Sequence, residues 1–375
     1  MHEKKTVYLV DGSAYIHRAY HAIRNLANST GLPTNATYGF TRMLLKLLEE
    51  RVPQYAAVVF DTKGKTFRHD LYADYKATRP PLPEDLIIQI PYIKRIVQGL
   101  NLKMLEKEGF EADDLIGTLA RKAEDQGYDV VVVTGDKDFR QIVSPRISLW
   151  DSMKDRVTDY QTLKTSYEGL EPEQMVDLMG LAGDSADNVP GVTGIGEKTA
   201  LSLIRTYGSV EGVYHNVEDI SRKKLKENLI RDRESAFLSK RLVALDCEVP
   251  LQAEVEDLKI SAPDAEALAA LFRELEFRDL WDRYASGSSS GVGKACVCLD
   301  EAGIQALVQE IREWKRVSLD TETTSKDPFR ADLVGLSFAL REGEAVYVPV
   351  GHVYAGAPAQ VPWEVAREIL REVLA

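Results

Sequence analysis

Carboxylates stand in this sequence at places where a fold would bring several of them together. Three short apolar runs each end in an aspartate, at Asp11, Asp61 and Asp136. Because the carboxyl ends of parallel strands meet at one edge of a sheet, we expect these side chains to lie close together. Further acids follow in tight groups: Glu111, Asp113, Asp114, Asp138, Asp184 and Asp187. The pattern predicts one acidic site built from distant parts of the chain.

Such an acidic site requires a cation, because like charges this dense repel one another. Mg²⁺ suits carboxylates that leave positions for water, and Mn²⁺ accepts the same ligands. Two ions about 4 Å apart can hold the attacking and leaving oxygens of a phosphodiester displacement. Any single acid could instead be a helix cap or a solvated charge, but that interpretation is poor for all nine together. The sequence therefore predicts a two-ion Mg²⁺ site with these acids as ligands.

The segments that carry the acids have an alternating pattern. Residues 6–11, 55–61 and 129–136 are continuous apolar runs, which is typical of strands buried on both faces of a parallel sheet. Helical patterns at 38–50 and 112–126 lie between them. This order predicts an α/β fold with a mostly parallel central sheet flanked by helices.

The remainder of the 375-residue chain divides into further segments. Helical patterns dominate 172–284, and 285–294 has the Ser/Gly composition of a flexible linker. A new α/β pattern follows, with a helix at 302–314 and strands at 317–320, 333–340 and 345–350. We therefore expect an α/β core at 1–171, a helical subdomain at 172–284, the linker, and an incomplete α/β domain at 295–375.

A glycine-rich loop within the helical segment could bind phosphate. It lacks the Lys directly after the last glycine that a Walker A loop requires, and no strand precedes it as in a dinucleotide fingerprint. A helix–hairpin–helix fits better, because its backbone N–H groups can face a DNA phosphate, and its carbonyls can hold K⁺. The alternative is an ordinary glycine-rich turn. The expected DNA-contacting residues are Gly191, Gly194, Gly196, Lys198 and Thr199.

A basic, aromatic stretch follows the second predicted strand. Cations interleaved with rings suit a single strand of nucleic acid, since cations track phosphates and rings stack on bases. Its members are Lys63, Phe67, Arg68, Tyr72, Tyr75, Lys76 and Arg79. A solvated amphipathic helix is the alternative. Arg18 lies seven residues after Asp11, about two helical turns, so it could face the acids and hold a scissile phosphate, or be a surface arginine.

The overall composition says less about the partners and the cellular compartment of the protein. The net charge of −12 argues against a nucleic-acid partner, but 63–79 has five Lys/Arg against two Asp, and 222–241 has eight against three acids. Three cysteines without a second Cys/His pair indicate a reducing compartment. No apolar run is long enough to span a membrane, so we expect a cytoplasmic protein without a membrane partner.

The ordered motifs of residues 5–284 resemble the 5′-nuclease domains of the flap-endonuclease family. The resemblance implies a PIN-like α/β core in which all nine acids bind metal. It implies that Arg18, Tyr75, Lys76 and Arg79 engage the 5′ strand, the last three on a helical gateway, with Arg18 and Lys76 also catalytic. The implied activity is a monomeric, structure-selective 5′–3′ exonuclease and flap endonuclease. Its expected substrates are DNA with 5′ ends or flaps and RNA primer strands, in replication and repair.

After the linker, a second resemblance is shorter. Asp320 and Glu322 in a strand, followed by the apolar run 333–338, resemble the start of a 3′–5′ proofreading exonuclease domain with a ribonuclease-H-like fold. Matches to the later acids of that family are absent before Ala375. We therefore expect an incomplete site, no proofreading and a partly ordered segment. A turn-like acidic cluster in an arbitrary domain is the alternative.

Two other functions are compatible with parts of the pattern. A PIN-like RNA nuclease would share the acids but should lack the hairpin. A DNA-end binding module would bind without turnover, so its binding should be unaffected by Mg²⁺. Titration of Mg²⁺ against a labelled flap substrate separates this module from a nuclease.

Overall fold

The computed structural model describes residues 5–288, 294–325, 330–341, 344–353 and 358–374. Its contacts divide the chain into two compact units, Met1–Asp282 and Arg283–Ala375, and each is described by itself. Within the described ranges, no helix combines the length and the apolar character needed to cross a membrane.

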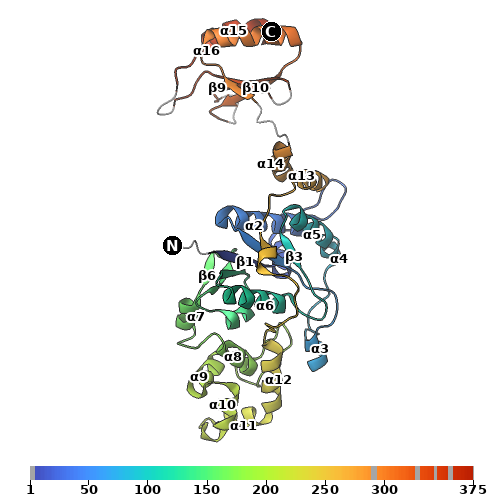
Figure 1. Cartoon of the computed structure of the whole chain (residues 1–375), viewed down its shortest axis with the longest axis vertical. Coiled ribbons are helices and arrows are strands. Elements are labelled where there is room, and N and C mark those ends of the chain that lie inside the picture. Colours follow the sequence, from blue (N-terminus) through green and yellow to red (C-terminus); the bar gives the residue numbers. More distant parts are fainter. Residues whose placement is uncertain (1–4, 289–293, 326–329, 342–343, 354–357, 375) are drawn as a thin grey trace. The chain divides into compact units, whose positions relative to one another are not determined.

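The first unit is built on a six-stranded sheet of order β3-β2-β1-β4-β5-β6 (Figure 1). Its strands are β1 (Thr6–Asp11), β2 (Tyr55–Val59), β3 (Lys103–Leu105), β4 (Asp129–Val133), β5 (Ile147–Asp151) and β6 (Arg156–Thr158). All neighbouring pairs are parallel except β5 with β6. The prediction of a mostly parallel sheet is confirmed. Because β1 lies between β2 and β4, the ends of the three acid-bearing strands are neighbours.

Helices cover this sheet. They are α1 (Gly12–Ala22), α2 (Asn35–Arg51), α3 (Phe67–Leu71), α4 (Glu84–Ile87), α5 (Ile90–Gly99), α6 (Ala112–Asp125) and α7 (Tyr160–Ser166), with the 3₁₀ helix η1 (Asp138–Ile142). Helix α6 packs against β1 and β4, where its Leu115 and Leu119 join a core with Leu9 and Val132. Helices α1, α2 and α5 pack together. Every residue of β2 is buried, as expected for a strand covered on both faces.

Helices dominate the next part of the chain, as predicted. They are α8 (Gln174–Ala182), α9 (Glu197–Tyr207), α10 (Val210–His215), α11 (Lys223–Arg231) and α12 (Arg233–Val243), with η2 (Val217–Asp219). They share an apolar core that includes Leu178, Ile204 and Leu242. The hairpin loop joins α8 to α9. These helices form the lower part of the unit in Figure 1.

The predicted boundaries differ from the structure in two places. After α12 the chain returns to the α/β core, where Val249 and Val255 join the cluster under α6 and α13 packs on α5. The elements of this return are η3 (Val255–Leu258), α13 (Ala265–Glu274) and α14 (Arg278–Ser288). The predicted linker is also partly wrong, because residues 285–288 form the end of α14. Its residues 289–293 lie outside the described residues.

The second unit is a smaller α/β structure. Its strands are β7 (Lys294–Val297), β8 (Ser318–Thr323), β9 (Leu333–Arg341) and β10 (Glu344–Pro349), in the order β7-β10-β9-β8. Two helices, α15 (Glu301–Trp314) and α16 (Trp363–Leu374), pack together and on the sheet (Figure 1). Leu336 and Phe338 of β9 are buried in its core, whereas every residue of the edge strand β8 is exposed.

Candidate metal centre

The strand-end aspartates lie at the carboxyl edge of the first sheet. Asp11 ends β1 and is 3% exposed. One of its carboxylate oxygens accepts the Ala14 N–H at 2.9 Å, and the other accepts the Thr134 hydroxyl at 2.9 Å. Asp61, just after β2, accepts the Ala112 N–H at 2.8 Å and donates its own N–H to Ser13 at 2.9 Å. These bonds fix the carboxylates of both aspartates against the amino ends of helices.

A third carboxylate joins these two from α6. Asp113 lies in the first turn of that helix, where a carboxylate also faces the positive end of the helix dipole. Burial raises its pKa well above the usual range, and the charges of Asp11, Asp136 and Asp61 raise it further. The pKa of Asp11 rises to about 7 for the same reasons, burial being the larger. Acids from four separate segments therefore act on one another electrostatically, as the sequence predicted.

The other acids gather around one small cavity. Its lining includes Glu111, Asp113, Asp138, Asp184 and Asp187. Burial raises the pKa of Asp138 to about 7, with a further contribution from Asp136. The Oδ1 atom of Asp138 is buried and has no hydrogen-bond partner among the described residues. A buried carboxylate oxygen without a partner, beside other acids, fits a hard divalent cation.

Lysine and arginine side chains of the chain form ion pairs with several of these carboxylates. The Lys76 ammonium lies 2.7 Å from Glu111 and 3.7 Å from Asp187, and Arg79 also pairs with Asp187. Lys137 pairs with Asp184 at 2.8 Å. Within the described part of the chain, no three acidic, His or Cys side chains already stand as a set of ligands for one ion. The chemistry of these carboxylate donors fits a hard divalent metal ion, although the set of ligands is not preformed.

Two residues predicted to be functional bind each other inside the fold. Asp114 is fully buried, and both of its oxygens accept Arg68 guanidinium N–H groups at 2.7 Å. The Asp114 oxygens also accept the N–H groups of Glu111 and Asp246. Hydrogen bonds thus satisfy both Asp114 oxygens in this structure, which indicates a structural role for Asp114, and its role as a metal ligand stays a prediction.

Arg68 is the other structural residue. It is 1% exposed and also donates to the carbonyls of Leu242 and Ala244, both at 2.8 Å. Its predicted contact with DNA is wrong, since its guanidinium is bound inside the fold. Arg68 and Asp114 together join α3 and α6 to the chain that leaves α12.

The other residues of the basic, aromatic stretch lie beside the acids. Tyr75 is 4% exposed, and its hydroxyl contacts Glu111 at 3.2 Å and Asp187 at 3.3 Å. Its ring belongs to the core of the helical part, so it presents no face on which a base could stack. Lys76 pairs with the same two acids, and Arg79 pairs with Asp187. Lys63 lines a neighbouring cavity of about 410 Å³ that Asp61 also borders.

Sequence reasoning missed several residues of the site. Lys137 pairs with Asp184, and Thr134 binds both Asp11 and the N–H of Asp136. Arg18 donates to Asp151 at 3.0 Å, and Asp151 ends β5 as Asp11 ends β1. The apolar run of 147–151, which also ends in an aspartate, was the signal that could have revealed Asp151.

The hairpin is only partly as predicted. Gly191 is buried and donates its N–H to Ser239 at 2.8 Å, so its predicted DNA contact is wrong. Its φ of +60° and its close packing on Gly183 explain why glycine stands there. Gly194 and Gly196 are exposed, and Gly196 is the N-cap of α9. Lys198 is exposed in the first turn of α9, followed by the half-buried Thr199.

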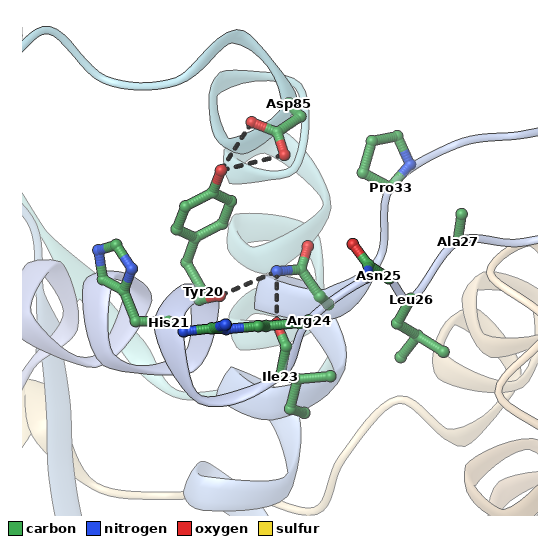
Figure 2. A pocket seen from close by; sticks show the side chains of 10 residues that line it. Tyr20, His21, Ile23, Arg24, Asn25, Leu26, Ala27, Pro33 and Asp85 are labelled. Carbon is green, nitrogen blue, oxygen red and sulfur yellow. Dashed lines mark hydrogen bonds between the residues drawn. The ribbon is translucent and has the colours of Figure 1, made fainter.

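A separate cavity of about 460 Å³ lies at the carboxyl end of α1 (Figure 2). There the Tyr20 hydroxyl contacts both oxygens of Asp85, at 3.0 and 3.1 Å. The Asn35 amide donates to the carbonyls of Tyr20 and Ile23. Tyr20, Asp85 and Asn35 of its wall thus bind neighbouring groups of the wall, and the acids of the metal centre do not line it. This cavity is therefore separate from the acidic site, which holds the candidate metal ligands.

Asp320 and Glu322 lie on the exposed edge strand β8 of the second unit. Asp320 accepts only the neighbouring Thr321 N–H in the described residues. Additional acids do not converge on them within the part of the unit that the structure describes.

The first unit combines strand-end acids, a mostly parallel sheet and a glycine hairpin, and its sequence matches models of 5′-3′ exonuclease domains. Residues 6–168 match the family described as the 5′-3′ exonuclease N-terminal resolvase-like domain, and 170–266 match its C-terminal SAM fold. Residues 297–375 match the 3′-5′ exonuclease family. The chain belongs to the 5′-3′ exonuclease family and continues into part of a 3′-5′ exonuclease domain.

Relatives extend this similarity over nearly the whole chain. DNA polymerase I of Pseudomonas aeruginosa is 41% identical over 98% of this chain and 42% of its own length. DNA polymerase I of Bacillus caldotenax is 42% identical over 91% of this chain and 39% of its own length. The chain therefore spans about two fifths of the relatives it matches.

Solved structures share the fold. The T5 5′-exonuclease with bound zinc superposes with a TM-score of 0.56 at 21% identity, covering 76% of this chain and 98% of that one. The catalytic core of Rad2 in complex with DNA superposes with a TM-score of 0.54 at 17% identity, covering 76% and 92%. At these identities the likeness concerns the fold alone.

Proposed function

We propose that this chain is a divalent-cation-dependent 5′–3′ exonuclease and flap endonuclease acting on DNA. The observation that carries the proposal is the convergence of buried, mutually repelling carboxylates from separate strands and helices at one sheet edge. Such a site is stable with cations and suits hydrolysis of a phosphodiester. The proposal covers only the activity of this portion, since the relatives are longer.

The residues that would hold two Mg²⁺ ions form two groups. Asp11, Asp61, Asp113 and Asp136 form the first, and Glu111, Asp138, Asp184 and Asp187 form the second. Asp113 connects the groups, because it also lines the cavity of the second. Bound divalent ions supply the positive charge that activates water and stabilises the phosphate under attack. Mn²⁺ would fit the same oxygens.

The chain's own cations would bind and orient the substrate. Arg18 would hold the scissile phosphate, because its guanidinium lies over the segment that joins Thr134 to Asp136. Lys76 and Arg79 would engage the 5′ strand, because both already lie at carboxylates of the site. The exposed amino end of α9, with Gly194, Gly196 and Lys198, would hold a duplex phosphate without reading sequence, and its loop carbonyls would hold K⁺.

The substrate class rests on the relatives as well as on the site. Solved structures of the fold include a T5 flap endonuclease with DNA and metal ions. We extend the substrate to DNA with 5′ ends or flaps and to RNA primer strands, cut by a cytoplasmic monomer in replication and repair. The second unit would not proofread, because its two acids stand alone on an edge strand.

The test is a Mg²⁺ titration of the whole chain with a labelled 5′-flap DNA, and a parallel titration with a single-stranded RNA. We expect cutting near the base of the DNA flap that rises with Mg²⁺ and stops with a chelator. Binding of the flap without cutting at any Mg²⁺ concentration would favour a DNA-end binding module. Faster cutting of the single-stranded RNA would favour the PIN-like RNA nuclease.

A further inference from the structure

The Arg18 side chain is held from one side by a buried acid. Arg18 lies on α1, and its Nη1 donates to Asp151 at 3.0 Å. The Asp151 side chain is only 6% exposed, whereas that of Arg18 is 28% exposed. A charge-assisted hydrogen bond to a buried partner fixes the direction of a flexible side chain more firmly than a surface ion pair would.

On its other side the guanidinium lies against Gly135. A Cβ atom added to Gly135 would overlap the terminal atoms of Arg18, and the three nearest atoms to it all belong to that guanidinium. Gly135 is not among the glycines with positive φ. Its backbone conformation is therefore open to other residues, and a side chain there would instead displace the flexible end of Arg18.

The segment beneath the guanidinium is itself fixed to the acids. The Thr134 hydroxyl donates to Asp11 at 2.9 Å and accepts the Asp136 N–H at 3.0 Å. Gly135 lies between these two residues in the chain. The position of the guanidinium is thus set relative to two of the strand-end acids, by Gly135 beneath it and by Asp151 beside it.

Most of the donors on Arg18 are still available. Among the described residues, the Arg18 side chain makes one hydrogen bond, to Asp151. A guanidinium carries five N–H donors in a planar fork, which suits a phosphate. An arginine that is fixed by one edge can present the others without losing much side-chain entropy.

We propose that Asp151 and Gly135 are positioning residues for Arg18 in the nuclease reaction. Asp151 holds one edge of the guanidinium, and Gly135 provides the space in which it lies beside the acids, so that its other donors meet a substrate phosphate. The inference rests on the proposed function, because it concerns the same site.

A structural role for Asp151 is the competing explanation, and its neighbour provides a matched control. Ser152 also joins α1 to the end of β5, through a 2.5 Å hydrogen bond with the buried Tyr15 hydroxyl. Ser152→Ala should weaken the docking of α1 without touching Arg18. We expect it to leave kcat within about twofold of the wild type, with a lower thermal midpoint.

The experiment is a set of double-mutant cycles in the whole chain, with kcat and KM measured on a 5′-flap DNA. Asp151→Asn and Gly135→Ala should each lower kcat about tenfold, with a smaller change in KM, because Arg18 is misplaced. In an Arg18→Ala background each should change kcat less than about twofold, because there is no guanidinium left to position. Thermal unfolding of every variant separates folding defects from these effects.

Two results would overturn the inference. One is an Asp151→Asn loss in the Arg18→Ala background as large as the loss in the wild type, which would show a structural role. The other is wild-type kcat in both Asp151→Asn and Gly135→Ala. If Gly135→Ala fails to fold, the Asp151→Asn cycle decides alone. Failure of the proposed function is distinguishable, because the wild-type chain would then not cut the flap at all.

Discussion

The acids of the first unit and the acids of the second unit lie in different surroundings. In the first unit, acids from the ends of β1, β2 and β4 meet acids from α6 and the hairpin region, and burial raises the pKa values of Asp11, Asp113 and Asp138. In the second unit, Asp320 and Glu322 come from one strand at a sheet edge whose every residue is exposed. Both units have strand acids that resemble nuclease motifs.

This difference indicates that a metal site forms where acids from several strands and helices converge, and not where two acids share one edge strand. A pair of exposed carboxylates is solvated by water and has little need of a cation, whereas buried neighbouring carboxylates are destabilised until one arrives. The four predictions below test this contrast, beginning with the largest expected effect.

Removal of a converging acid should have the largest effect. We expect Asp113→Ala to lower the rate of flap cleavage by at least about 100-fold, because a metal ligand and its charge are lost. Flap binding, measured by fluorescence anisotropy in EDTA, where no metal couples to the DNA, should change little, since the phosphate contacts lie elsewhere. Asp125→Ala, an exposed acid at the other end of α6, is the matched control. Full cleavage by Asp113→Ala would contradict the metal centre.

The neighbouring acid should affect stability instead. Asp114→Ala leaves the buried Arg68 without its carboxylate, so the free energy of unfolding should fall by about 3–5 kcal/mol. Asp113→Asn should raise stability in chelator, because it removes repulsion from Asp11 and Asp136. Urea unfolding in EDTA measures both. A stable Asp114→Ala protein would mean that Asp114 is not the structural member of the pair.

The buried acids should also make metal-free stability depend on pH. The folded pKa values of Asp11 and Asp138 are about 7, above their unfolded values near 4. Between these values the folded protein holds protons that the unfolded chain has lost, so stability should fall as pH rises from about 4 to about 7 and then level off.

Thermal midpoints across this pH range test the effect, and the fall should amount to several degrees. Mg²⁺ should restore stability most at the upper end, where the carboxylates are ionised. Asp138→Asn should flatten the profile. A metal-free midpoint that rises between pH 5 and 7 would contradict the assignment.

The smallest effect belongs to the second unit. In an Asp136→Ala background, which silences 5′ cutting, we expect no Mg²⁺-dependent shortening of DNA from its 3′ end. Asp320→Ala should then change nothing, because the two β8 acids lack converging partners in the described residues. Shortening from the 3′ end that disappears with Asp320→Ala would show a working proofreading site.

Much of the fold could be predicted from the sequence. Continuous apolar runs of strand length identified β1, β2 and β4, because burial on both faces leaves no other pattern. The acids at their ends followed directly, since strand direction fixes which end meets the site. The predicted helix at 112–126 corresponds to α6 within one residue at its carboxyl end.

The features that the sequence did not predict depend on contacts between residues that lie far apart in the chain. Asp113 and Asp114 are adjacent in the sequence, and only the fold shows that Arg68, 46 residues from Asp114, binds the second of them. Likewise, Gly191 appeared to be one of three equivalent hairpin glycines until Ser239 was found to hold its N–H. Residues 285–288 continue a helix despite their linker-like composition, because the preceding turns already direct them.

The ion pairs of Lys76 and Arg79 have a thermodynamic consequence. A metal ion bound by the carboxylates of Glu111 and Asp187 would weaken their attraction for Lys76 and Arg79, and a phosphate bound by these two side chains would weaken it as well. If both bind as proposed, metal and DNA would each remove part of the cost of binding the other. Thermodynamic linkage then requires both effects to be equal. The factor by which bound metal raises the affinity for DNA would be the factor by which bound DNA raises the affinity for metal.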